Sequence, residues 1–329
     1  MENLSEMPHF QIDFSDIAIV IPTLNRPEKA ASRAEFWSKR GCQVIVAEGA
    51  LHSEISLDPS ILHVRSDNSF ANRILEALSL TDAGLVALHP DDDFFSPRGL
   101  LFAAQELADT GISHGFCYGK TWEWVKSKNG DKLFPMYEAS RTRRYSKKLY
   151  SLHFGSEGRF KFVPKVKYET CMLFGIYRRE TLIKNCQVLR KHEPKCYGGF
   201  EILNSLLLLL EDSARYIPET LWLRDTSVPS VSADGDSWDR RIEFDEWYER
   251  EFDTWIVEFE TTFLQLRGFQ KDTADLDITL LRSGISSFFQ TFLSSSSDQN
   301  VRQLRKWFDY SLRRLSSRNA DSELSELPW

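Results

Sequence analysis

Three consecutive carboxylates, Asp91, Asp92 and Asp93, come directly after His89-Pro90 and the short apolar run 85–88. Four apolar residues of strand-forming type are too few for a helix and fit a buried central strand. The acids therefore lie at the carboxyl end of a strand. Adjacent negative charges repel one another, and hard carboxylate oxygens suit Mg2+ or Mn2+. The triplet predicts a divalent-cation site, and an acidic turn or helix N-cap is the alternative.

Polar residues also follow two earlier strands, at 23–26 and at Glu48. The expected elements are strands at 17–24, 42–47, 61–65 and 85–88, and helices at about 28–40, 69–80 and 97–110. This alternation predicts an α/β fold with a doubly wound, mostly parallel, Rossmann-like sheet and helices on both faces. Ligands bind such sheets beyond the carboxyl ends of the strands, where all of these polar residues fall.

The second half of the chain reads differently. Its expected elements are strands at 115–125, 171–177 and 214–217 and a helix at about 199–211. Beyond that, aromatic residues recur at steps of three to five with acids between them, which predicts an amphipathic helix; they are Trp247, Phe252, Trp255, Phe259 and Phe263. We therefore expect a catalytic domain over 1–235 and an α-helical C-terminal extension over 236–329.

Bulk properties narrow the function classes. The 329 residues carry a formal charge of -7, which argues against a nucleic-acid binder that works by overall attraction. The five cysteines form no CxxC pair, and no secretory signal or membrane-length apolar run is visible. There is also no GxGxxG and no Walker A sequence. We expect a cytoplasmic protein.

Two basic segments could contact anions. Residues 141–167 hold nine basic residues and one acid, which fits a lid over the diphosphate, a site for an anionic acceptor, or a solvated surface loop. Residues 298–318 alternate basic and apolar side chains. They could rest on an anionic membrane at its inner face, or pack against the catalytic domain or a second copy in a homo-oligomer.

The order of these motifs resembles the family 2 nucleotide-sugar glycosyltransferases with the A-type (GT-A) fold. The resemblance covers about 17–225 and rests on the strand and turn 19–26, Glu48-Gly49, Asn72, the acidic triplet as a DxD-like motif, the return strand and helix start 172–180, and Gly198-Gly199-Phe200-Glu201. It implies that the turn after the first strand wraps the nucleotide, through Pro22, Thr23, Leu24, Asn25 and Arg26.

The resemblance also implies roles for the acids. Glu48 would contact the base or ribose, where the family more often has Asp, and Asn72 would lie near the nucleotide. Asp91 or Asp92 would face the ribose. Asp93 would hold the metal that bridges the diphosphate, with Asp91 as the second metal ligand of the motif.

The chemistry of transfer then needs a base. A divalent cation neutralises the leaving diphosphate, and a carboxylate removes the acceptor proton. Glu201, which opens a helix, is the candidate, and Glu193 is the runner-up. The resemblance implies inversion, a UDP- or GDP-type donor, and a glycan or lipid-linked acceptor in surface polysaccharide assembly. The alternatives are a sugar nucleotidyltransferase and a catalytically inactive scaffold.

Overall fold

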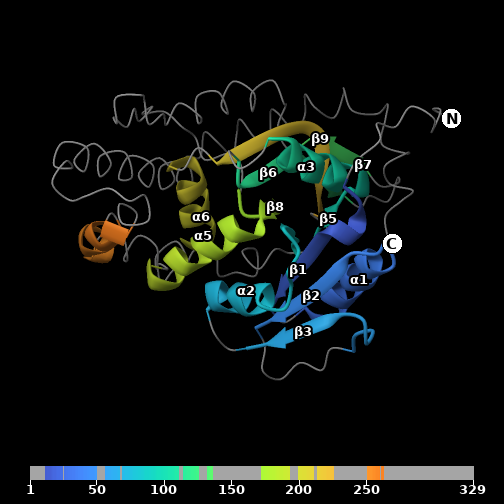
Figure 1. Cartoon of the computed structure of the whole chain (residues 1–329), viewed down its shortest axis with the longest axis horizontal. Coiled ribbons are helices and arrows are strands. Elements are labelled where there is room, and N and C mark those ends of the chain that lie inside the picture. Colours follow the sequence, from blue (N-terminus) through green and yellow to red (C-terminus); the bar gives the residue numbers. More distant parts are fainter. Residues whose placement is uncertain are drawn as a thin grey trace.

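The structure is a computed structural model, and it describes residues 12–24, 26–49, 56–66, 69–110, 114–125, 132–135, 172–192, 199–210, 213–225, 250–259 and 261–262. Within these residues nine strands form one sheet in the order β3-β2-β1-β4-β8-β6-β9-β5, with β7 paired to β6 (Figure 1). The strands are β1 (Ile17–Thr23), β2 (Gln43–Glu48), β3 (Leu62–Arg65), β4 (Leu85–Leu88), β5 (Phe94–Phe95), β6 (Phe116–Val125), β7 (Lys132–Pro135), β8 (Gly175–Arg178) and β9 (Ala214–Asp225). The helices are α1 (Pro27–Ser38), α2 (Phe70–Leu78), α3 (Pro97–Asp109), α5 (Arg179–His192) and α6 (Gly199–Leu210).

Most strands of this sheet run in one direction. β1 is parallel to β2 and β4, and β2 is parallel to β3. β8 is antiparallel to both β4 and β6, so β6 runs the same way as β4, and β9 is parallel to β6. The carboxyl ends of these six strands therefore meet at one edge. The predicted α/β, mostly parallel sheet is confirmed, and β5, β7 and β8 are its antiparallel members.

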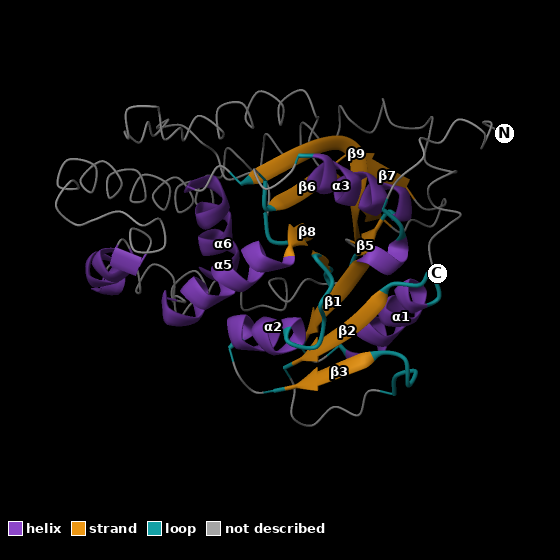
Figure 2. Ribbon diagram, in the orientation of Figure 1, coloured by secondary structure: helices purple, strands orange, loops and turns teal. Residues whose placement is uncertain are grey.

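Helices cover both faces of the sheet (Figure 2). Successive side chains of a strand point to opposite faces, so β1 contributes to two cores. Ile17, Ile19 and Ile21 pack in the cluster that includes α1 and α3. Ala18 and Val20 pack in the cluster that includes α2, α5 and α6. Burial on both faces explains why this strand is a continuous apolar run in the sequence.

β9 is much longer than the predicted strand 214–217, because the strand continues through Pro218. The register between β6 and β9 shifts between the pairs Tyr118–Tyr216 and Lys120–Thr220. A proline lacks the N–H of a regular ladder and is tolerated at such an irregularity. β9 therefore reaches the carboxyl edge of the sheet and ends there.

Residues 250–259 and 261–262 are helical and lie against the end of α5. Trp255 and Phe259 are buried, and Trp255 Nε1 donates a hydrogen bond of 2.6 Å to the carbonyl of His192. The aromatic spacing therefore predicted this helix and its buried side correctly. The division of the chain into a catalytic domain and a helical extension stays a prediction.

In the described part of the chain, none of the helices is both long and apolar enough to cross a membrane. The basic segments 141–167 and 298–318 lie outside the described residues, so the predicted lid and the predicted membrane contact stay predictions.

Candidate functional site

The acidic loop, residues 89–93, connects β4 to β5 and is fixed by His89. The His89 N–H donates to the carbonyl of Val20 over 2.9 Å, Nδ1 lies 2.6 Å from the carbonyl oxygen of Pro90, and the N–H of Phe95 donates to Nε2 over 3.3 Å. Because a carbonyl only accepts and a backbone N–H only donates, Nδ1 carries the proton and the ring is neutral. Burial lowers the pKa of His89 to about 3. The loop therefore has a neutral anchor with one fixed tautomer.

Asp91 and Asp92 share one guanidinium, which lies just beyond β1. The hydroxyl of Thr23 donates to Asp91 Oδ2 over 2.7 Å. Arg26 Nη1 lies 3.4 Å from Asp91 Oδ1 and also binds a carboxylate oxygen of Asp92. Burial raises the pKa of Asp91, and the charge of Asp92 adds to that rise. The structure thus brings together four residues that the sequence predicted for the donor site.

Asp93 is held by the end of β9. Trp222 Nε1 donates to Asp93 Oδ2 and the N–H of Asp225 donates to Asp93 Oδ1, each over 2.8 Å. Arg33 Nε donates to the Asp93 carbonyl over 2.9 Å. The residue is 4% exposed, and burial together with the charge of Asp92 raises the pKa of its carboxyl to about 8. Asp93 ties the acidic loop to β9, a role that the sequence did not predict, and metal binding by Asp93 stays a prediction.

Glu48 ends β2 and is also buried. Both His63 Nε2, at 2.9 Å, and Arg65 Nε, at 3.0 Å, contact the same oxygen, Oε2, so the carboxylate is oriented by β3. His63 and Arg65 are two residues apart and so lie on one face of β3. Glu48, which the sequence predicts to contact the base or ribose, is therefore held in place through its carboxylate oxygen Oε2.

A side chain of α2 holds the backbone where β1 and β2 end side by side. Arg73 Nη1 donates to the carbonyl of Thr23 over 3.2 Å, and the N–H of Gly49 donates to the same carbonyl over 2.9 Å. A Cβ atom at Gly49 would lie 1.8 Å from Arg73 Nη1, so a larger residue there would have to displace this guanidinium. Beside it, Leu24 is 47% exposed. Pro22 is buried within β1, and Asn25 lies outside the described residues.

α1 brings cations to the acidic loop. Arg26 is the N-cap of α1, and Arg33 lies two turns further on. Lys29 Nζ is buried and makes no hydrogen bond among the described residues. Burial lowers the pKa of Lys29, and the charges of Asp225 and Asp92 oppose that shift. An ammonium group without a hydrogen-bond partner can neutralise and bind an incoming anion such as a phosphate.

The two remaining candidates lie in the first turns of helices. Asn72 is the third residue of α2 and Glu201 is the third residue of α6, and both are half-buried. The two turns meet through the rings of Phe70 and Phe200, whose centroids are 4.4 Å apart. Because α2 begins beyond the end of β3, this contact brings Glu201 to the same edge of the sheet. Glu193 lies outside the described residues.

Comparisons with known proteins give similarity only to solved structures. Neither the protein-family models nor the curated protein sequences contain a match to this chain. Among solved structures, TarS of S. aureus in complex with UDP-GlcNAc is 12% identical, with a TM-score of 0.42, and the match covers 84% of this chain and 81% of TarS. The mannosyltransferase PcManGT from Pyrobaculum calidifontis, in complex with GDP-Man and Mn2+, is 13% identical, with a TM-score of 0.40 and coverage of 94% and 85%.

A third similar structure is a synthetase. CMP:2-keto-3-deoxy-manno-octonic acid synthetase, complexed with CTP, is 12% identical, with a TM-score of 0.35 and coverage of 71% of this chain and 99% of that one. These similarities concern the course of the chain and do not assign it an activity.

Proposed function

We propose that this chain is a nucleotide-sugar glycosyltransferase. It moves a sugar, with inversion, from a UDP- or GDP-type donor to a hydroxyl of a glycan or lipid-linked acceptor, in surface polysaccharide assembly. The observation that carries the proposal is the meeting of Thr23 and Arg26 with Asp91 and Asp92 beyond the carboxyl ends of β1 and β4. That edge is where doubly wound sheets bind their ligands.

The nucleoside end of the donor has candidate contacts between β1 and β2. Glu48 is an acceptor for a base N–H or a ribose hydroxyl, and His63 and Arg65 keep it oriented. The exposed side chain of Leu24 offers an apolar surface to a base. Asn72, at the start of α2, offers an amide to the nucleotide.

The diphosphate end has positive partners. Arg26, the N-cap of α1, and Lys29, in its first turn, lie at the end of the helix where the dipole also favours an anion. Among the described residues, Lys29 Nζ has no hydrogen bond that would have to break when it binds a phosphate oxygen. These two side chains would orient the diphosphate and neutralise the charge that develops on it as the sugar leaves.

Asp91 and Asp92 fit a divalent cation as a pair, in place of the predicted pair Asp91 and Asp93, because both carboxylate oxygens of Asp93 accept hydrogen bonds from β9. Mg2+ is usually held by one or two carboxylates together with substrate phosphates, and these two carboxylates already share a positive partner in Arg26. No group of three or more metal-ligating side chains occurs within the described residues, which agrees with a site that the donor completes. When bound, Mn2+ or Mg2+ would act as a Lewis acid on the leaving diphosphate.

The acceptor hydroxyl needs a base on the side away from the leaving group. Glu201, at the start of α6, is our candidate for the group that removes its proton, with Glu193 as the alternative. A single displacement of this kind inverts the configuration at the sugar carbon.

The test is turnover of a panel of nucleotide sugars. We expect one of UDP-Glc, UDP-GlcNAc, UDP-Gal and GDP-Man to release its nucleoside diphosphate slowly to water and faster with an acceptor, in the presence of Mn2+ or Mg2+ and not with a chelator. Pyrophosphate release from a nucleoside triphosphate and a sugar 1-phosphate would indicate a nucleotidyltransferase instead. No turnover and no binding of any donor would indicate a scaffold.

A further inference from the structure

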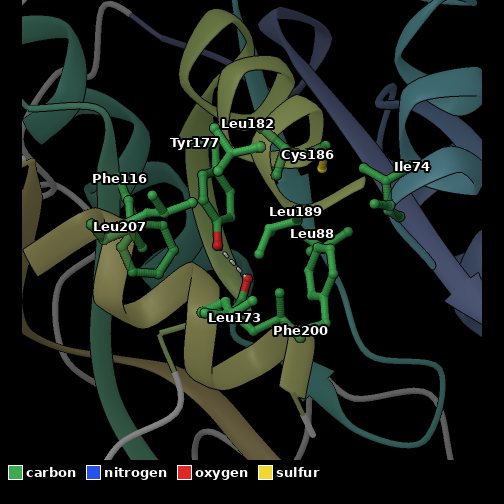
Figure 3. Close-up of a cluster of buried hydrophobic side chains, with 14 of the residues drawn as sticks. Ile74, Leu88, Phe116, Leu173, Tyr177, Leu182, Cys186, Leu189, Phe200 and Leu207 are labelled. Atoms are coloured by element: carbon green, nitrogen blue, oxygen red, sulfur yellow. Dashed lines mark hydrogen bonds between the residues drawn. The ribbon is translucent and has the colours of Figure 1, made fainter. Parts of the chain in front are cut away.

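Side chains, not a strand ladder, hold the backbone of the segment just before β8. The Met172 N–H donates to the hydroxyl of Ser205 over 3.3 Å, and Asn204 Nδ2 donates to the Met172 carbonyl over 2.7 Å. The hydroxyl of Tyr177 donates to the carbonyl of Leu173 over 2.7 Å, the contact drawn in Figure 3. We call Asn204 and Ser205 the α6 clamp, because both grip the same residue, Met172.

The α6 clamp lies in an apolar environment. Asn204 and Ser205 are fully buried, and they belong to the same helix as Phe200 and Leu207, two members of the apolar cluster drawn in Figure 3. Asn204 also binds the Tyr177 hydroxyl, at 2.9 Å, and accepts a bond of 3.0 Å from Asn185. A buried amide is costly unless its groups are paired, and a fully paired network admits one geometry. The α6 clamp therefore fixes position as well as filling space.

The gripped segment leads to the acidic loop. Gly175, which opens β8, pairs with Leu88 at the end of β4, so residues 172–174 lie beside the start of that loop. The ring of Phe174 lies 5.5 Å from the ring of Trp222, and Trp222 Nε1 binds Asp93. A chain of direct contacts therefore runs from Met172 to the acidic loop.

The α6 clamp also holds the turn that carries the candidate base. The hydroxyl of Ser205 accepts from the Met172 N–H and donates to the carbonyl of Glu201 over 2.9 Å. One hydroxyl thus bridges the backbone of Glu201 and the backbone that leads to Asp93.

We propose that Asn204 and Ser205 are positioning residues, which set the candidate base Glu201 relative to the acidic loop. This inference rests on the proposed function, since it assigns the α6 clamp a part in sugar transfer. Because both side chains are fully buried, neither would touch the substrate. Their effect is on kcat, because a displacement of about 1 Å between reacting groups can lower a rate by roughly 10²-fold while donor binding at the other half of the site is unchanged.

The experiment compares Asn204→Leu with Asn185→Leu in the full chain. Asn185→Leu removes the donor to Asn204 Oδ1 but keeps the bonds from Asn204 and Ser205 to Met172. It should therefore destabilise the fold without moving Met172 relative to α6. Asn204→Leu removes the bond to the Met172 carbonyl. The double variant Asn185→Leu/Asn204→Leu replaces both partners of the Asn185–Asn204 hydrogen bond. No buried amide is then left without its partner, so the fold should be less destabilised than in a single variant.

We measure kcat and donor KM for transfer, together with the urea midpoint of unfolding. Asn204→Leu and the double variant should lose kcat roughly 10²-fold with donor KM within about twofold of the wild type, whereas Asn185→Leu should keep kcat. Ser205→Ala should lose kcat and Ser205→Thr should recover it, because threonine keeps the hydroxyl.

The outcomes separate the two proposals. If the wild type turns over a donor but Asn185→Leu and Asn204→Leu lose kcat equally, or if the double variant keeps kcat, the positioning role is wrong and the proposed function stands. If the wild type turns over no donor, the proposed function is wrong, and the positioning role is wrong with it.

Discussion

The two sides of the candidate site are held by different kinds of bond. At the ends of β1, β2 and β4, charged groups make the contacts: Arg26 with Asp91 and Asp92, and Arg65 with Glu48. At the start of β8 and α6, neutral amides and hydroxyls make them, and they are fully buried. Charged pairs near an edge can exchange partners for a phosphate or a cation, whereas a buried neutral network cannot change without leaving a group unpaired. The first side is built to bind and the second to hold a position.

The largest expected effect is that of Glu201→Gln, which should lower the rate of transfer without weakening donor binding. Glu201→Gln should lower kcat roughly 10²- to 10⁴-fold, because an amide cannot accept the acceptor proton. Donor affinity should stay within about twofold, since the change is isosteric and lies on the positioning side. Steady-state kinetics and donor calorimetry check both values. Retained turnover would move the role to another residue, and Glu193→Gln would be measured next.

Asp92→Asn tests the binding side. We expect donor turnover to fall on the order of 10²-fold and to lose its response to Mn2+, because Lewis-acid stabilisation of the leaving diphosphate is worth several kcal/mol. The same substitution at Asp93 serves as the comparison, since Asp93 binds Trp222 and Asp225. If Asp93→Asn removes the Mn2+ response and Asp92→Asn does not, our assignment of the metal ligands is reversed.

His89 gives the acidic loop a dependence on pH. Its folded pKa, about 3, is below the unfolded value of about 6.5, so the unfolded chain binds more protons at mildly acidic pH. Stability from His89 is complete above about pH 6.5 and is lost as pH falls towards 3. Between pH 7.5 and 5 the wild type should lose on the order of 2 kcal/mol more than His89→Asn, which does not titrate.

Urea unfolding of both proteins at the two pH values measures that difference. Asp93 contributes in the opposite direction, because its raised pKa makes it bind a proton more readily in the fold. That contribution is common to both proteins and cancels. Equal pH dependence in the wild type and the variant would mean that His89 is not buried in the neutral form.

A further prediction concerns the hydrogen bond from Trp222 to Asp93, which joins the two sides of the site. Trp222→Phe keeps a ring beside Phe174 but removes the N–H that binds Asp93. We expect a loss of about 1–3 kcal/mol in the free energy of unfolding, the usual cost of leaving a buried acceptor without its donor. Thermal and urea unfolding measure it. A loss below about 0.5 kcal/mol would show that Asp93 does not depend on this bond.

The binding side was largely predictable from the sequence. β1 and β4 are continuous apolar runs, and each ends abruptly at polar residues, so the chain itself marks the edge where Thr23 and Asp91 meet. Even the partners of Glu48 follow a local rule, because His63 and Arg65 are two residues apart on the neighbouring strand.

The positioning side was not predictable in the same way. Trp222 and Asp93 are 129 residues apart in the sequence, and the residues around each of them do not predict that the two side chains form a hydrogen bond. The sequence signal for this part of β9 was the alternation of Leu221 and Leu223 beyond Pro218. It indicates that the strand continues past the proline, which would ordinarily be taken as its end. Asn204 lies inside an apolar helix, where a single amide predicts a buried partner but does not identify Met172.

Donor binding tests the central claim most directly. Each nucleotide sugar of the panel is titrated calorimetrically, with Mn2+ present, into the wild type, into Asp91→Asn, and into Glu106→Gln, whose partner Arg215 lies near the opposite end of β9. We predict that one donor binds the wild type and Glu106→Gln equally and binds Asp91→Asn at least tenfold more weakly, which is about 1.4 kcal/mol. Equal binding to all three proteins, or binding of no donor, would contradict a nucleotide-sugar site at the carboxyl edge of this sheet.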